Sequence, residues 1–172
     1  MNKKVLVIPL ALIIATILVV PVMAEPTRGQ KVAAEMYPQV LPYDEVEPDK
    51  DWTTNGGIAQ SRGGQTDFYP IALKIGSDLY ENGYSTNINN EVFNSKTLVS
   101  NIRSDTVWTF AGIGGFAGNI EMKLWFVEGI PLPYYSIHTL MHGFGDFEGQ
   151  TLMLSYDGPL MGAVWTGYCL KA

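Results

Sequence analysis

Cysteine is nearly absent from this chain: Cys169 is the only one among 172 residues. A single cysteine excludes an internal disulfide, so the fold must be held together by packing, even in an oxidising compartment. Cys169 lies in the apolar segment "VWTGYCL" at positions 164–170. Free cysteine is among the most buried residue types, so we expect a buried thiol rather than a reactive one.

Basic residues are also few. The chain has 11 Lys and Arg against 17 Asp and Glu, a formal net charge of −6. An acidic surface repels the phosphate backbone of nucleic acids and anionic lipid headgroups. We therefore expect no nucleic-acid partner.

Signatures of familiar enzymes are missing as well. The sequence contains no G-x-S-x-G elbow, no phosphate-binding P-loop and no His, Cys and Asp at nucleophile spacing. This disfavours hydrolases and kinases of the usual types, and we lean toward a protein that is not an enzyme.

Only two histidines occur, His138 and His142 in "HTLMH". On a helix this spacing would direct both rings at one metal ion. The surrounding residues favour a strand instead, on which the two would lie ~13 Å apart at ~3.3 Å per residue. A single zinc holds each nitrogen at ~2.1 Å, so the sequence predicts no metal site, and nothing in it indicates a cofactor.

The N-terminus has the pattern of a secretory signal peptide. Lys3 and Lys4 precede an apolar run from Val5 to Val22, and a cleavage-type sequence ends at Ala24. We expect residues 1–24 to be removed and the protein to be secreted or held at the cell surface. An uncleaved anchor is the alternative, because the run is at the short edge of the spanning range. Membrane contact is expected only during export or through such an anchor.

Without that segment the chain divides into two parts of different composition. Removing Lys3 and Lys4 from the 11 basic residues leaves nine against 17 acidic ones, a formal charge of −8. Residues 25–67 contain four prolines, the acidic run "YDEVEPDKD" and two glycine pairs. That composition predicts a loosely packed arm or linker. Residues 68–172 are rich in β-branched and aromatic residues and are expected to form the folded domain.

Two glycine-rich segments dominate that domain, "GIGGFAGNIEMKLW" from Gly112 and "GFGDFEGQTLMLSY" from Gly143. Both read G-x-G-x-F-x-G and run into residues that alternate between apolar and polar, as half-buried strands do. Glycines in strands usually mark bends or close backbone approach, which a sheet needs to close on itself. We predict an all-β fold, an antiparallel meander closing into a small barrel of about 7–8 strands. A β-sandwich is the alternative.

These two motifs resemble the glycine-rich kink of the allene oxide cyclase and dirigent-like β-barrel group. The resemblance implies an antiparallel barrel of about eight strands whose lumen holds small hydrophobic molecules. The start of the predicted mature chain matches nothing in that group, and the group's polar lumen residues match no position here. The resemblance therefore bears on the fold more than on the activity.

Candidate ligand-binding residues are the histidines and the aromatic residues of the domain, because ligand pockets are mostly apolar with a few polar groups. The same aromatic residues could simply fill the core. The candidates are Trp125, Tyr134, His138, His142 and Trp165.

Asp146 and Glu148, two positions apart, invite an acid–base interpretation, but solvated charges at a bend are the favoured explanation. The best hypothesis is an exported binding module for a small apolar or aromatic molecule. An isomerase or cyclase-type enzyme, using lumen groups such as His138 with a carboxylate, is one alternative. A structural or adhesive protein of the cell envelope is another, and the sequence leaves the oligomeric state open.

Overall fold

The regular structure of the described chain is entirely β. The computed structural model describes residues 29–38, 52–126, 133–159 and 163–171. Its strands are β1 (Gln30–Pro38), β2 (Trp52–Asn55), β3 (Ile58–Ile75), β4 (Asp78–Asn94), β5 (Val99–Phe110), β6 (Gly114–Trp125), β7 (Tyr134–Gly145), β8 (Thr151–Pro159) and β9 (Trp165–Lys171). The predicted signal peptide lies outside the described residues. Within these ranges no helix is long and apolar enough to cross a bilayer.

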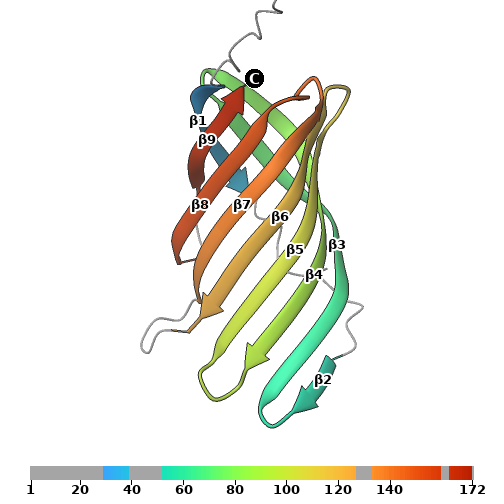
Figure 1. The fold of residues 1–172 in the computed structure, drawn as a ribbon, viewed down its shortest axis with the longest axis vertical. Coiled ribbons are helices and arrows are strands. Elements are labelled where there is room, and N and C mark those ends of the chain that lie inside the picture. The colour runs from blue at the N-terminus through green and yellow to red at the C-terminus, as the bar shows by residue number, and fades with distance from the viewer. Residues whose placement is uncertain (1–28, 39–51, 127–132, 160–162, 172) are drawn as a thin grey trace, which may run out of the picture.

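The strands form a closed antiparallel barrel (Figure 1). From β2 to β9 each strand pairs with the next along the chain, and β1 pairs with both β9 and β3 to close the ring. Eight strands therefore make the barrel, and β2 pairs only with the first residues of β3, outside the ring. This confirms the predicted antiparallel barrel and excludes the sandwich.

The predicted arm differs most from the structure. Within residues 25–67, β1 is a full member of the barrel and β3 begins at Ile58. The segment of β1 contains alanines and charged residues, a composition typical of helices, yet Ala34 and Met36 are buried in the barrel core. Pairing with two neighbouring strands overrides that local preference. The acidic run falls within residues 39–51, which lie outside the described residues.

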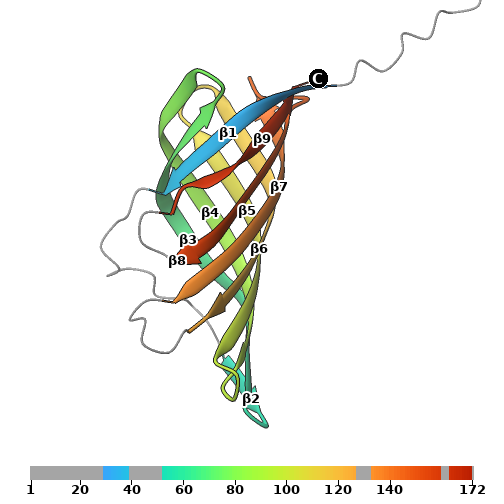
Figure 2. The same ribbon diagram turned by 90° about the vertical axis from the view of Figure 1, so that its left-hand side faces the viewer.

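The β1–β3 pairing that closes the ring is short. β1 pairs with β3 over only five positions, Ala34–Pro38 against Ile71–Ile75. β3 and β4 are 18 and 17 residues long, so they continue well past this closure. Figure 2 shows β1 and β9 covering one half of the barrel, while β3, β4 and β5 extend toward β2. The molecule thus has a closed half and an extended half.

The closed half is filled with side chains. Its core contains large buried residues from seven strands and one turn. The tilted ring pairs Phe116–Phe147 and Trp108–Trp165 lie there, with centroids 4.8 Å and 6.0 Å apart. An eight-stranded barrel is about wide enough for side chains alone to fill it. The core is therefore a packed interior. Cys169 is fully buried there, as predicted, and burial raises the pKa of its thiol.

The two glycine motifs lie side by side, as predicted for neighbouring bends. Gly114 pairs with Gly145, and Gly115 pairs with Phe144. Their roles differ, however. The first motif turns the chain from β5 into β6, whereas the second ends β7 and makes the turn into β8. The prediction that both motifs are strand entrances is therefore wrong for the second.

Close backbone contact explains the glycines. A Cβ atom on Gly115 would lie 1.8 Å from the carbonyl oxygen of Trp108, and one on Gly143 would lie 1.9 Å from that of Phe147. Only a residue without a side chain tolerates such approach. The missing side chain of Gly143 allows the Phe147 backbone to fold back over the end of β7, so that the Phe147 ring reaches the core.

Candidate functional site

The five predicted ligand-binding residues do not share the barrel interior. On β7 the odd-numbered residues from Tyr135 to Met141 are buried, and on β6 the even-numbered Phe116 and Ile120 are. Neighbouring strand residues point to opposite faces. Trp125, Tyr134, His138 and His142 therefore face outward. Trp165 alone faces inward, where it packs against Trp108.

Four of the five thus gather on the outer face of β6 and β7. Trp125 and Tyr134 are paired in the sheet, with ring centroids 6.0 Å apart, and the Lys123 ammonium lies 5.8 Å from the Trp125 ring. His138 lies further along β7, and His142 follows it four residues later. The Nδ1 atom of His142 lies 3.4 Å from Thr151 Oγ1. The structure therefore separates these four outward residues from Trp165, which lies in the barrel interior.

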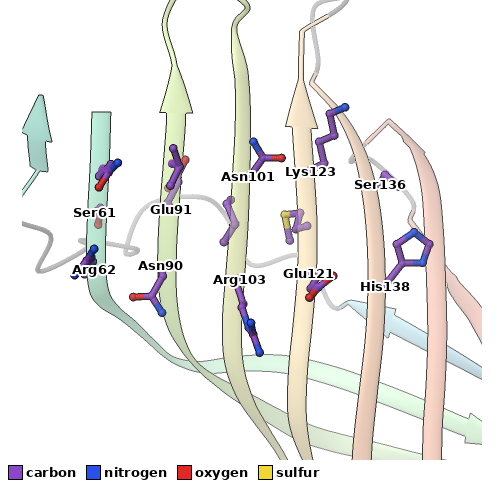
Figure 3. Close-up of a pocket in the computed structure, with 14 residues that line it drawn as sticks. Ser61, Arg62, Asn90, Glu91, Asn101, Arg103, Glu121, Lys123, Ser136 and His138 are labelled. Atoms are coloured by element: carbon purple, nitrogen blue, oxygen red, sulfur yellow. The ribbon is translucent and has the colours of Figure 1, made fainter. Parts of the chain in front are cut away.

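A groove of about 680 Å³ crosses this outer face from β3 to β7. Figure 3 shows its labelled side chains on the neighbouring antiparallel strands of the sheet. Its outward polar and charged side chains are Gln60, Arg62, Asn90, Asn101, Arg103, Glu121, Lys123, Ser136 and His138. A second, smaller groove of about 330 Å³ continues past His138 over β8 and β9. We call the larger one the outer groove.

Sheet register sets the order of the groove side chains. Asn90, Arg103, Glu121 and His138 are direct cross-strand neighbours on β4, β5, β6 and β7. Neighbouring strands lie ~4.8 Å apart, so this row runs straight across the groove. Lys123 stands two residues along β6 from Glu121, on the same face.

A bulge in β3 adds Arg62 to the end of this row. The register of β3 and β4 shifts between Ser61 and Gly64, so that Arg62 and Gly63 together oppose Asn90. Gly63 has a φ of +69°, and its N–H donates to Asn90 Oδ1 at 3.3 Å. The glycine pair that resembled a loop in the sequence is therefore a bulge that fixes the Asn90 side chain.

The groove is locally basic in an acidic protein. Arg62, Arg103 and Lys123 line it, with Glu121 as its outward carboxylate. In the part of the chain that the structure describes, no ion pair engages these three cations. On β3, by contrast, Lys74 lies 3.6 Å from Glu35, which also accepts a hydrogen bond from Tyr37. The Tyr37 hydrogen bond and the Lys74 charge lower the pKa of Glu35.

Inside the barrel, β4 and β5 carry a polar wall that sequence reasoning missed. Its hydrogen bonds join Thr106 to Asn87 at 2.8 Å, Ser104 to Asn89 at 2.5 Å and Ser100 to Glu91 at 2.5 Å. The signal was present as polar residues at every second position of "SxNxNxE" from Ser85. Because β5 hydroxyls occupy these amide and carboxylate oxygens, the wall stabilises the pairing of two strands.

Other candidates lie apart from the groove. Asp146 and Glu148 are exposed in the turn after β7, where their backbone N–H groups donate to Ile113 and Gly145. Among the described residues no group of three or more His, Cys, Asp or Glu side chains is arranged to hold a metal ion. The Asp146–Glu148 pair therefore belongs to the turn.

Comparison with known proteins adds nothing to this geometry: no family model, no curated protein and no solved structure matches the chain.

Proposed function

We propose that this protein is a binding module for a small organic molecule, and that its ligand lies in the outer groove. The observation that carries the proposal is the groove itself, because about 680 Å³ is within the range of small-molecule sites. Arg62, Arg103 and Lys123 supply polar anchors, and the Trp125–Tyr134 pair on the same face supplies an aromatic surface. These two features agree with the expectation of an aromatic ligand.

The outer face is preferred to the lumen because of the packing. The resemblance to allene oxide cyclase and dirigent-like barrels implies a ligand inside the barrel, yet buried aromatic residues fill the closed half here. The outer face also carries Arg103 and Asp105 in the middle of β5, with Glu121 beside them on β6. Charges at such positions are costly against lipid, which supports a surface that faces water.

The isomerase or cyclase alternative receives less support. It requires His138 and a carboxylate to converge in an enclosed lumen. His138 faces outward and is exposed, opposite Glu121, and its ring borders two open grooves. General acid–base catalysis gains most where water is excluded, so this arrangement favours binding over catalysis.

Filling the groove tests the proposal. Ser136 is half-buried and borders both grooves, so Ser136→Trp should occlude the site without touching the core. A small-molecule library is screened by protein-observed NMR, with hits expected to shift amides around Asn101, Lys123 and Ser136. The variant should lose at least about tenfold in affinity for those hits, since a filled pocket loses its contacts.

The matched control is Thr109→Trp, an outward position on β5 outside the groove, which should bind hits as the unaltered protein does. Hits that shift only core amides, or that bind Ser136→Trp unchanged, would show that the groove is not the ligand site.

A structural or adhesive envelope protein is the second candidate, and one observation favours it. Five large apolar side chains of β4, β5 and β7 are between 37% and 47% exposed: Tyr84, Ile88, Val107, Leu140 and Phe144. Large apolar side chains exposed on one face of a sheet are typical of an interaction surface.

Sedimentation velocity distinguishes this candidate. Concentration-dependent self-association is expected to disappear in Val107→Ser/Leu140→Ser and to persist in Leu98→Ser, a comparably exposed leucine in the β4–β5 turn. A chain that stays monomeric at every concentration contradicts adhesion through this face between copies.

A further inference from the structure

The outer groove contains a more specific site at its β3–β5 end. We infer that Arg62, Asn90 and Arg103 bind the oxyanion of a small organic molecule, a carboxylate, sulfate or phosphate group. This inference rests on the proposed function and names the chemical class of its ligand. The three side chains come from three adjacent strands and lie consecutively across the groove.

Spacing allows the two arginines to act together. Arg62 and Arg103 flank Asn90 from the strands on either side, so their backbones are ~10 Å apart at ~4.8 Å per strand. Long arginine side chains can close on one group held above Asn90. Arginine presents a planar fork of donors that matches an oxyanion, and such charge-assisted hydrogen bonds are among the stronger ones.

Asn90 is oriented as a donor. Its Oδ1 accepts the Gly63 N–H at 3.3 Å, which turns the two hydrogens of Nδ2 away from the bulge. Arginine has donors only, so the three neighbouring side chains all present donors at this end of the groove. A ligand group that accepts hydrogen bonds and carries negative charge satisfies this set, whereas a neutral or cationic group does not.

The remaining charges locate the anion within the groove. Glu121 is the direct neighbour of Arg103 on the β6 side, and Lys123 is its diagonal neighbour. The Glu121 carboxylate repels an anion placed beside β6. Arg62 lies on β3, two strands beyond Arg103, so that end of the groove is the most positive. From there a ligand extends toward the exposed Lys123 and the aromatic pair.

Two isosteric probes test the charge requirement. 2-Naphthoate and 2-naphthamide share one aromatic body and differ in the oxyanion. NMR titration of the protein should show naphthoate shifting the amides near Asn90 and Arg103, with an affinity at least about tenfold above that of naphthamide, the loss expected when a charge-assisted contact is removed.

Variants assign the contacts. Arg62→Gln and Arg103→Gln are each expected to weaken naphthoate at least about tenfold and to leave naphthamide unchanged. Arg103→Lys should recover part of the loss, because it restores charge without the fork. Lys171→Gln, an equal change of charge at the far end of β9, should bind as the unaltered protein does.

The outcomes separate this inference from the proposed function. Equal binding of both probes in the groove overturns the oxyanion site and leaves a binding module. Naphthoate affinity that falls equally in Lys171→Gln shows general charge attraction and also overturns the site. Groove amides that respond to neither probe, nor to any library member, contradict the site and the proposed function together.

Discussion

Gly115→Ala is expected to lower the free energy of unfolding by at least about 3 kcal/mol, the upper part of the range for overpacking. The added Cβ would meet the Trp108 carbonyl oxygen at 1.8 Å and the Phe144 ring at 3.1 Å. The first of these is backbone and belongs to a hydrogen-bonded ladder, so it cannot move aside as a flexible side chain would. Strands β5 and β6 must separate locally to accept the methyl group.

Chemical denaturation followed by tryptophan fluorescence measures this loss. The matched control is Gly112→Asn in the same motif. Gly112 has a φ of +79° and open space around its Cβ position, and asparagine tolerates that conformation better than most residues. The control should stay within about 1 kcal/mol of the unaltered protein. Equal losses in both variants would show that backbone conformation, rather than close approach, selects the glycines.

Phe116→Ala should cost about 3–5 kcal/mol, the range for removing a buried phenylalanine. Its side chain is fully buried and packs against Phe147, with ring centroids 4.8 Å apart. These are the phenylalanines of the two glycine motifs, so the substitution removes the side-chain contact between the motifs in the core. A cavity forms in the closed half of the barrel, where the surrounding strands have little freedom to collapse.

Phe126→Ala is the control for lost ring area, because Phe126 is 53% exposed just after β6. Its expected effect is below about 1 kcal/mol. Denaturation midpoints at constant m-value compare the two variants directly. A Phe116→Ala loss no larger than the control would mean that the two motifs are not coupled through the core.

Strands that alternate cleanly could be predicted from the sequence. Ile120 and Leu154 mark the buried faces of β6 and β8, and Trp108 and Phe110 are buried together on β5 as expected. Each of these strands has one core face and one wet face, so the period of two is visible in the residues.

β1 could not be predicted because its evidence is not local. The segment gains its strand conformation from β9 and β3, which lie at distant positions in the chain. Its own composition, two alanines between Lys31 and Glu35, indicates a helix as readily. The glycine pair at 63–64 was misjudged for a related reason, since a bulge and a loop use the same residues.

Part of the candidate site could also be predicted. Aromatic and histidine content directed the prediction to residues of the β6–β7 region, but the choice of face depends on which residue of each neighbouring pair meets the core. A one-residue change of register exchanges the two faces. Arg62, Asn90 and Arg103 gave no sequence signal, because they are far apart in the chain and meet only through the pairing of β3, β4 and β5. Kinship with the allene oxide cyclase and dirigent-like group stays a prediction.

The position of β1 has a consequence for biogenesis. Gln30 at its start pairs with Lys171 at the end of β9. Of the described strands β1 is therefore synthesised first, but it cannot pair with β9 until that strand, the last of them, has been made. Assembly governed by such distant pairings is slow. Until β9 has been made, the incomplete sheet presents two open edges, which invite pairing with other chains. A chaperone that shields those edges would therefore matter most before the seven residues of β9 have been synthesised.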